Sequence, residues 1–356
     1  MAQIRTNNRG CFNTLAQSET NILNKPLLIV NGNGSKLSDS NGLKRKAKRK
    51  VITQSVVKKM IDLDEKNENK EWQKSLWNTY HCQNKIHSAN GNIYGKYCKN
   101  RFCTLCSSIR KADLINKYLP IIKTWEQPYF VTLTARSVKV KSLKKRLEDM
   151  NRGFRIISSK LRKQNQRGTG TKLVGIKSLE CNYNPIVKTY NPHLHLLVAN
   201  KAMAEQLIKE WLILCTNKDG KKWAEKWVQD MRPAYDSEKV LIEIIKYSSK
   251  IFTDPTENKK YNTKNASQQD IYVKAYGNIL KAMQGLRIFD RFGFNLPKES
   301  SVPKVNSKVV KNYDEWKFDP KQSDWINTES YETLTKYIPT AQLLEILNNR
   351  ANTDSE

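Results

Sequence analysis

Two histidines separated by one residue are the side chains best placed to do chemistry in this chain. His193 and His195 flank Leu194 in the run Asn-Pro-His-Leu-His-Leu-Leu-Val. In a β-strand, side chains two residues apart project from the same face, so both imidazoles can converge on one metal ion. The alternative is two polar residues on a half-exposed strand, and so short a motif does not decide between them.

A second reactive group stands further along the chain, in an apolar stretch that contains Glu243 and Tyr247. Lys246 and Lys250 share the same four-residue spacing, and residues four apart lie on one face of a helix. A phenol attacks phosphorus well at neutral pH only if a metal polarises the phosphate and its deprotonation is assisted. The lysines can stabilise the phenolate or hold the phosphate, and Glu243 can accept a proton. An ordinary amphipathic helix is the alternative.

The segments that must position these groups alternate between strand-like and helix-like patterns of apolar residues. Residues 129–134 form a β-rich run, Tyr-Phe-Val-Thr-Leu-Thr, and residues 143–161 and 202–215 have helical patterns. A sheet that carries the histidines, covered by helices of which one carries the tyrosine, would bring the two into one pocket. We therefore predict an α/β catalytic domain over residues 120–298. The sequence alone leaves open whether its sheet is parallel or antiparallel.

Three motifs occur in a fixed order along this domain. They are Phe-Val-Thr-Leu-Thr at 130–134, Pro-His-Leu-His-Leu at 192–196 and Glu-x-x-Lys-Tyr-x-x-Lys at 243–250. In this order they resemble the plasmid rolling-circle replication initiators (Rep proteins) of the HUH endonuclease superfamily. The resemblance covers residues 96–298, and the third motif is its most specific part. It implies an HUH-type antiparallel sheet with helices packed on it.

The resemblance also implies a role for each matched residue. His193 and His195 would hold a Mg²⁺ or Mn²⁺ ion that polarises the scissile phosphate. Tyr247 would attack that phosphate, leaving a 5′-phosphotyrosyl enzyme and a free 3′-hydroxyl that primes synthesis. Glu243 would activate water for the last cleavage, the role of a second tyrosine in other branches. Ile251 stands four residues beyond Tyr247, so this is no paired-tyrosine site.

The activity expected from this resemblance is nicking and strand transfer at a plasmid double-strand origin that is single-stranded at the nick. No phosphate-cradling loop of the form GxxxxGK[ST] occurs in the chain, so we expect no ATP use. A host helicase and polymerase are the expected partners.

A third metal ligand is needed because two imidazoles leave most of the coordination sphere open. Glu180 is our candidate, since it ends the probable strand 172–180. Folding the chain about the 184–191 connection would place Glu180 opposite His195. A carboxylate suits Mg²⁺ and imidazole suits transition metals such as Mn²⁺. A surface carboxylate on a strand is the alternative.

Four of the seven cysteines are clustered with the spacing C-x15-C-x4-C-x2-C. They are Cys82, Cys98, Cys103 and Cys106. Because disulfides are rare in cytosolic proteins and thiolates fit tetrahedral Zn²⁺, we predict a structural zinc site. His81 or His87 are candidate substitutes, and buried free cysteines are the alternative.

The charge of the chain indicates a nucleic-acid partner independently of any motif. Lysine and arginine number 63 against 34 acidic residues, which gives a net charge of +29. Phosphate contact then predicts binding that weakens steeply with salt, and charge alone does not separate DNA from RNA. No long apolar segment or signal peptide is visible, so we expect no membrane contact and a cytoplasmic location.

The remaining segments complete the predicted organisation. Residues 1–70 read as a disordered basic arm, in which Lys44, Arg45 and Lys46 are candidate DNA contacts. Residues 71–119 would form the cysteine-centred module. Residues 299–356 read as a polar tail that ends in a short helix over 340–348.

Two further sets of residues are open to a DNA-binding interpretation. Arg287 and Arg291, four residues apart, would contact backbone phosphates or flank a turn. Trp211, Trp223 and Trp227 recur on amphipathic patterns and are expected in the core, with stacking on unpaired bases as the alternative.

Two rival classes of protein have to be weighed against a Rep protein. A non-enzymatic, zinc-containing DNA-binding regulator would explain the charge and the cysteines, but not the histidine and tyrosine motifs. An HUH transposase or relaxase would explain the chemistry. Such transposases are usually much shorter, and relaxases usually place the tyrosine ahead of the histidines. The order of the motifs in this chain favours a Rep protein.

Overall fold

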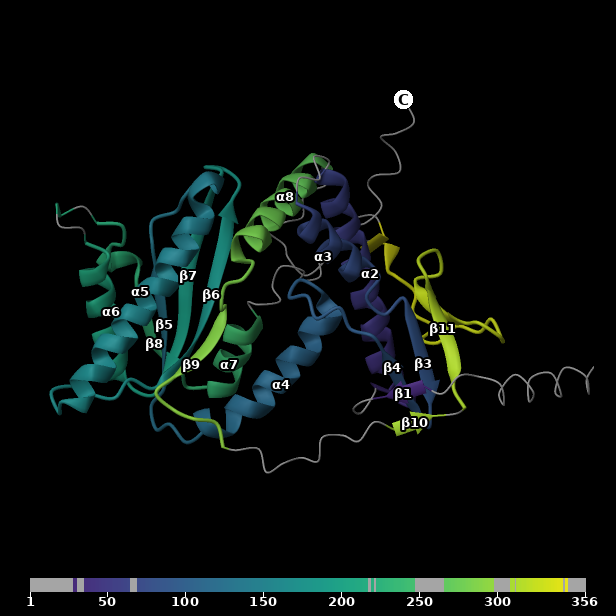
Figure 1. The fold of residues 1–356 in the computed structure, drawn as a ribbon, viewed down its shortest axis with the longest axis horizontal. Coiled ribbons are helices and arrows are strands. Elements are labelled where there is room, and N and C mark those ends of the chain that lie inside the picture. Colours follow the sequence, from purple (N-terminus) through teal and green to yellow (C-terminus); the bar gives the residue numbers. More distant parts are fainter. Residues whose placement is uncertain are drawn as a thin grey trace, which may run out of the picture. The chain divides into compact units, whose positions relative to one another are not determined.

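The computed structural model describes residues 28–30, 35–64, 69–216, 219–220, 222–246, 266–297, 308–310, 312–341 and 343–344 (Figure 1). The chain divides into two compact units, and each draws on separate stretches of the sequence. One unit contains residues 52–80 and 98–297, and the other contains residues 81–97 and 298–339 together with the chain up to residue 51.

The larger unit is built on an antiparallel sheet with the strand order β8-β5-β7-β6-β9. Its strands are β5 (Tyr129–Thr134), β6 (Gly175–Asn184), β7 (Thr189–Val198), β8 (Asp230–Pro233) and β9 (Phe289–Phe292). The two long central strands, β6 and β7, form a hairpin whose turn is residues 185–188. In this turn the Asn184 side chain accepts a hydrogen bond from the Ile186 amide at 3.0 Å, and Lys188 takes a positive φ of 52°. The β-rich runs of the sequence therefore form one sheet, and it is antiparallel.

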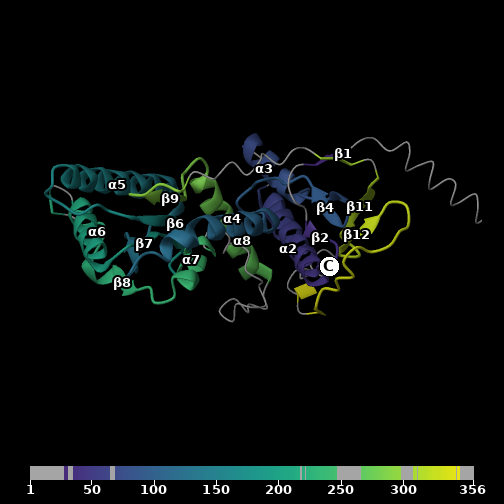
Figure 2. The same cartoon turned by 90° about the horizontal axis from the view of Figure 1, so that it is seen from below.

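Helices cover both faces of this sheet (Figure 2). The helices α5 (Val140–Gln166) and α6 (Lys201–Leu214) pack on the face that carries Leu133, Leu194 and Leu196. The helices α4 (Thr104–Ile122) and α7 (Ser237–Lys246) pack on the opposite face, against Phe130 and Leu197. Alternation along each strand explains this division, because neighbouring residues point to opposite faces. The prediction of an α/β fold with helices packed on an antiparallel sheet is confirmed.

The same unit contains a second helical cluster. The helix α8 (Ala266–Met283) packs with α3 (Lys70–Tyr80) and with the second half of α2 (Ser40–Leu63). Val57, Trp72, Leu76 and Leu280 form its buried centre. The Lys281 ammonium pairs with Asp64 at 2.7 Å. A short 3-10 helix, η1 (Lys226–Val228), precedes β8.

The smaller unit is a five-stranded antiparallel sheet with the order β12-β11-β3-β4-β2. Its strands are β2 (Ser35–Lys36), β3 (Lys85–Ala89), β4 (Asn92–Gly95), β11 (Asp314–Asp319) and β12 (Asp324–Asn327). Leu43 and Ala47 from the first half of α2 pack on this sheet. A separate two-stranded pair joins β1 (Leu28–Val30) to β10 (Lys308–Val310).

The structure corrects the expectation of disorder in one segment and adds strands to another. Within the segment predicted as a disordered arm, residues 40–63 form the helix α2, because Leu43, Ala47 and Val57 recur at helical spacing and bury one face. Residues 1–27 lie outside the described residues. Within the predicted polar tail, β11 and β12 bury Trp316, Phe318 and Trp325. Both segments are polar on average, and this average composition concealed the short runs in which buried apolar residues recur at regular spacing. The helix expected over 340–348 falls largely outside the described residues.

Candidate active site

Three potential metal ligands converge on the face of the larger sheet that α4 and α7 cover. Glu180 on β6 and His193 on β7 are directly opposite each other, and His195 follows two residues along β7. The Nε2 atoms of His193 and His195 each lie 3.4 Å from Oε2 of Glu180. All three side chains are buried. One ligand atom from each lies within 4.8 Å of the others, which is a spacing that a single metal ion can bridge.

The register of the hairpin differs from the predicted one. Glu180 is paired with His193 rather than with His195, whose partner is Ser178. The reason is the turn, which contains residues 185–188 and is tighter than the 184–191 connection that the sequence suggested. A shift of two residues keeps a side chain on the same face of a sheet, whereas a shift of one would have moved it to the other face. Glu180 therefore still meets both histidines.

Hydrogen bonds orient the two imidazole rings. Nδ1 of His193 lies 3.0 Å from the Asn191 carbonyl oxygen, which only accepts, so this nitrogen donates and Nε2 keeps its lone pair. Nδ1 of His195 lies 3.1 Å from the hydroxyl of Thr132 on β5. Phe130 stacks on the His195 ring, with centroids 5.0 Å apart. The backbone and the β5 side chains thus present both Nε2 atoms toward Glu180, as metal ligation requires.

The helix α7 carries Glu243. The Glu243 carboxylate lies 3.8 Å from the guanidinium of Arg232 on β8. That guanidinium lies over the Phe130 ring, 4.9 Å from its centroid, and Phe130 in turn stacks on His195. A chain of contacts therefore connects α7 to the histidines through β8 and β5.

The predicted nucleophile itself is not described. Tyr247 and Lys250 lie outside the described residues, as does the side chain of Lys246, the last residue of α7. In the sequence, Tyr247 immediately follows that helix. The structure thus establishes the position of Glu243 and leaves the roles of Tyr247, Lys246 and Lys250 as proposals.

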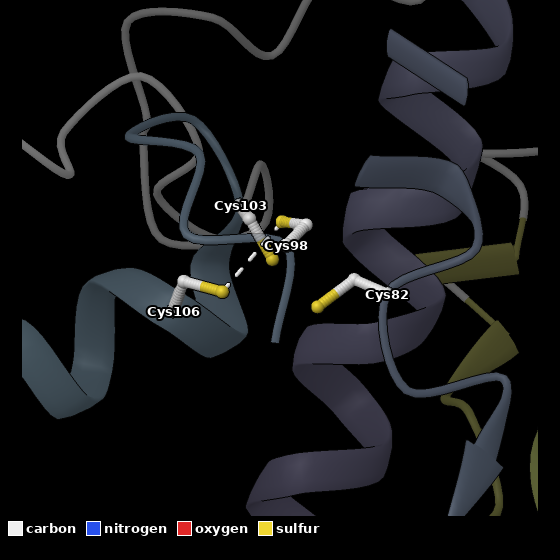
Figure 3. Close-up of side chains that lie close together, drawn as sticks. All are labelled: Cys82, Cys98, Cys103 and Cys106. Carbon is white, nitrogen blue, oxygen red and sulfur yellow. Dashed lines mark hydrogen bonds between the residues drawn. The ribbon is translucent and has the colours of Figure 1, made fainter. Parts of the chain in front are cut away.

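The four clustered cysteines lie together in the structure (Figure 3). Their sulfur atoms are all within 4.8 Å of one another, and those of Cys98 and Cys106 are 3.6 Å apart. Four sulfurs bound tetrahedrally to Zn²⁺ at ~2.3 Å would be separated by about 3.8 Å, so this group fits the ion. Cys103 and Cys106 stand at the N-terminus of α4, where the helix dipole favours thiolates.

The two histidines considered as substitute ligands are not part of the cysteine group that the described residues form. Nδ1 of His81 lies 3.0 Å from the Asn84 amide. His87 on β3 lies with its Nε2 3.8 Å from the Glu315 carboxylate.

The predicted DNA contacts in the basic run of α2 have different surroundings. Lys44 and Arg45 are exposed, and Arg45 lies 4.0 Å from Asp39. Lys46 is buried, with its ammonium group 5.9 Å from the centre of the Trp325 ring. Burial lowers the pKa of Lys46 from 10.5 to about 8. The prediction that Lys46 contacts DNA phosphates is therefore wrong, because the helix turns this residue toward the core of its unit.

The two arginines near β9 are both exposed. The Arg287 guanidinium lies 3.2 Å from the Asp290 carboxylate. Arg291, on β9, is at the edge of the larger sheet. Nothing in this arrangement prevents either guanidinium from reaching a phosphate.

Sequence reasoning missed three residues that complete the site: Phe130, Thr132 and Arg232. Phe130 and Thr132 belong to the Phe-Val-Thr-Leu-Thr run, and their period-two spacing was a signal that both face the histidines. Arg232 carried no comparable signal, because only the pairing of β8 with β5 brings it to Phe130.

Comparisons with known proteins identify the family. The sequence model of the Rep_1 family, described as "Replication protein", matches residues 92–332. The chain belongs to this Rep family. The resemblance that the three motifs indicated is therefore confirmed.

Individual members of the Rep family are also similar to the chain. A "Protein rep" of Staphylococcus aureus is 33% identical over 168 residues, which are 43% of this chain and 69% of that protein. A "Protein rep" of Bacillus amyloliquefaciens is 28% identical over 237 residues, 57% of this chain and 68% of that protein. One of Streptococcus pneumoniae is 25% identical over 218 residues, 53% of this chain and 63% of that protein. No solved structure matches the chain significantly.

Membership of the Rep family supports the role of a plasmid replication initiator. The metal-ligand group lies inside the matched residues, as do three of the four clustered cysteines. None of the helices in the described ranges is long and apolar enough to cross a membrane.

Proposed function

We propose that this protein initiates rolling-circle replication by nicking one strand of a plasmid origin and joining it to Tyr247. The observation that carries the proposal is the convergence of Glu180, His193 and His195 on the sheet face that α7 covers, with Tyr247 directly after α7. Phosphoryl transfer to a phenol needs a metal ion that polarises the phosphate and a tyrosine that attacks it.

The three buried ligands would hold a Mg²⁺ or Mn²⁺ ion. Their donor set, one carboxylate oxygen and two imidazole nitrogens, suits a divalent ion of this kind and leaves positions open for substrate oxygens. When bound, the ion would polarise the scissile phosphate and lower the barrier to attack.

The chain's own residues then carry the transfer. The Tyr247 oxygen forms a bond to phosphorus as the bond from phosphorus to the 3′ oxygen breaks. The phenol loses one proton, and the departing 3′ oxygen takes up one, so the reaction needs no other reagent. Lys246 and Lys250 stabilise the developing phenolate or the phosphate. The product is a 5′-phosphotyrosyl protein and a 3′-hydroxyl primer.

Glu243 acts in the last cleavage. Its carboxylate accepts a proton from a water molecule that attacks the second phosphate, which ends the cycle without a second tyrosine. Arg232, 3.8 Å away, holds the carboxylate in place. A host polymerase extends the 3′-hydroxyl, and a host helicase unwinds the duplex ahead of it. Arg287, Arg291, Lys44 and Arg45 contribute to DNA binding.

The experiment that tests this proposal is a covalent-adduct assay. A labelled single-stranded origin oligonucleotide is incubated with the protein and Mn²⁺ or Mg²⁺, using wild type, Tyr247→Phe and His195→Ala. Tyr331→Phe, a change at an exposed tyrosine in the smaller unit, is the matched control. We expect an adduct with wild type and the control only, and none after EDTA. Tight DNA binding without any adduct would instead favour a zinc-containing regulator.

We also propose that Cys82, Cys98, Cys103 and Cys106 hold a structural Zn²⁺ ion. Metal analysis of the purified protein should give one zinc per chain, and Cys103→Ser should lower both the zinc content and the melting temperature. Cys215→Ser, at a buried cysteine outside the group, should leave the zinc content unchanged. Wild-type protein that is folded and free of zinc would contradict the proposal.

A further inference from the structure

Two aromatic side chains that flank β8 in the sequence are almost fully exposed. Trp227 in η1 is 83% exposed, and Tyr235, two residues after β8, is 94% exposed. Trp227 therefore does not belong to the core, unlike Trp211, which is fully buried. Single exposed apolar side chains are common on protein surfaces, so the significance of these two rings depends on where they stand relative to the metal ligands.

The strand between these two rings is aligned with the metal ligands. Asp230 on β8 is paired with Thr132 on β5, and Thr132 is paired with His195 on β7. Adjacent strands are about 4.8 Å apart, so β8 lies ~10 Å from the strand that carries the histidines. The Gln229 side chain bonds to both backbone groups of Thr134, the residue opposite His193. The segment between Trp227 and Tyr235 thus runs past the level of both histidines.

β8 is also an edge of the sheet as far as the described strands go. A DNA strand that is bound at the metal ligands and runs toward β8 therefore leaves the sheet across β8. The two exposed rings lie at either end of that exit.

The charges around β8 favour contact with the bases of a bound DNA strand over contact with its phosphates. Lys226 and Arg232 are exposed, but so are Asp230 and Asp236. The charges nearly cancel, so this edge has little attraction for a phosphate backbone. Aromatic rings stack on any base, and only an unpaired base has both of its faces free for stacking.

We propose that Trp227 and Tyr235 stack on unpaired bases of the origin strand next to the scissile phosphate. This inference rests on the proposed nicking function and adds to it the surface that selects single-stranded over duplex substrate. Both aromatic residues are positioning residues, since they hold the strand and do not touch the reacting atoms.

The test compares affinity for one origin oligonucleotide in single-stranded and in duplex form. Fluorescence anisotropy is measured with wild type, Trp227→Ala, Trp227→Phe, Tyr235→Ala and the control Tyr331→Ala, whose exposed tyrosine lies in the smaller unit. Loss of one stacked base weakens binding by about 5- to 150-fold. We expect this loss for both alanine variants on the single strand, partial recovery with Trp227→Phe, and unchanged duplex affinity.

Steady-state cleavage gives a second measurement. KM should rise in Trp227→Ala while kcat changes little, because the variant loses substrate binding and not the reacting groups. Equal single-strand affinity in all variants would overturn the inference, and so would an equal loss on single strand and duplex. If wild type forms no adduct yet the alanine variants lose single-strand binding, the nicking proposal fails and the stacking surface stands.

Discussion

At the scale of single residues, the site depends on side chains that hold the ligands rather than on the ligands alone. Thr132 and the Asn191 carbonyl each occupy the Nδ1 side of one imidazole. This leaves the Nε2 side of each ring facing Glu180. Partners of this kind fix the orientation of a ligating histidine and raise its affinity for the metal.

Thr132→Val should therefore weaken the binding of Mn²⁺ by about 10- to 100-fold without removing a ligand. Titration of the metal, followed by calorimetry or by the concentration needed for half-maximal cleavage, measures this change. Thr124→Val is the control, because its hydroxyl donates to the Ile121 carbonyl at the end of α4, away from the metal ligands in the sequence. Equal metal affinity in Thr132→Val and wild type would show that the hydroxyl does not orient His195.

A second residue-scale prediction concerns the buried Lys177. Burial lowers its pKa from 10.5 to about 8, and its ammonium donates to the Asn151 side chain at 2.9 Å. Between pH 8 and pH 10.5, Lys177 is largely protonated in the unfolded chain and largely deprotonated in the folded chain. The free energy of unfolding therefore rises with pH over this range. At neutral pH the folded protein bears the cost of a buried charge.

Lys177→Met should therefore raise the free energy of unfolding at pH 7 by about 1–3 kcal/mol. The gain over wild type should shrink above pH 8 and vanish near pH 10.5. Urea denaturation at pH 7, 9 and 10.5 checks this, with the exposed Lys172→Met as control. A difference that does not depend on pH would rule out the buried charge as its cause.

At the scale of elements, the β6–β7 hairpin and the strand β9 beside it set the geometry of the ligands. Gly293 ends β9 with a φ of +78°, and a Cβ atom there would lie 1.8 Å from the Leu173 oxygen. The backbone just before β6 therefore packs directly on Gly293. Only glycine allows this approach, because both the conformation and the space exclude a side chain.

Gly293→Ala should lower the free energy of unfolding by about 3 kcal/mol or more, since backbone atoms must move to admit the methyl group. Gly168→Ala is a matched control, because Gly168 has a similar φ of +72° with no atom within 4 Å of the added Cβ. It should cost only the strain of a left-handed residue, about 1–2 kcal/mol. Thermal or urea unfolding compares them, and equal losses would contradict this account of β9.

At the scale of the whole molecule, the net charge of +29 predicts how the protein binds DNA. Each phosphate that it neutralises releases counterions, so affinity falls as salt rises. We expect binding to an origin duplex to weaken by roughly 10³ to 10⁵ between 50 and 200 mM salt if 6–10 phosphates are contacted. Anisotropy titrations measure the slope, with sucrose of matched osmolarity as control. A flat slope would mean that the charge is not used for DNA binding.

The sequence by itself determined the family of this protein. The types and order of His193, His195, Glu243 and Tyr247 indicated it, because a family motif is a matter of residue identity and spacing. Period-two alternation placed both histidines on one face of a strand, and this depends only on local backbone geometry. The spacing of the cysteines likewise predicted a group that the fold brings together.

The tertiary structure decided what depends on partners distant in sequence. The length of the hairpin turn set the register that pairs Glu180 with His193. The pairing of β8 with β5 brought Arg232 to Phe130. Trp227 is exposed, although its local pattern resembled that of a core residue. The helix α2 and the strands β11 and β12 likewise owe their order to apolar faces buried against other segments. Such burial is a property of the assembled core, and no single stretch of sequence contains it.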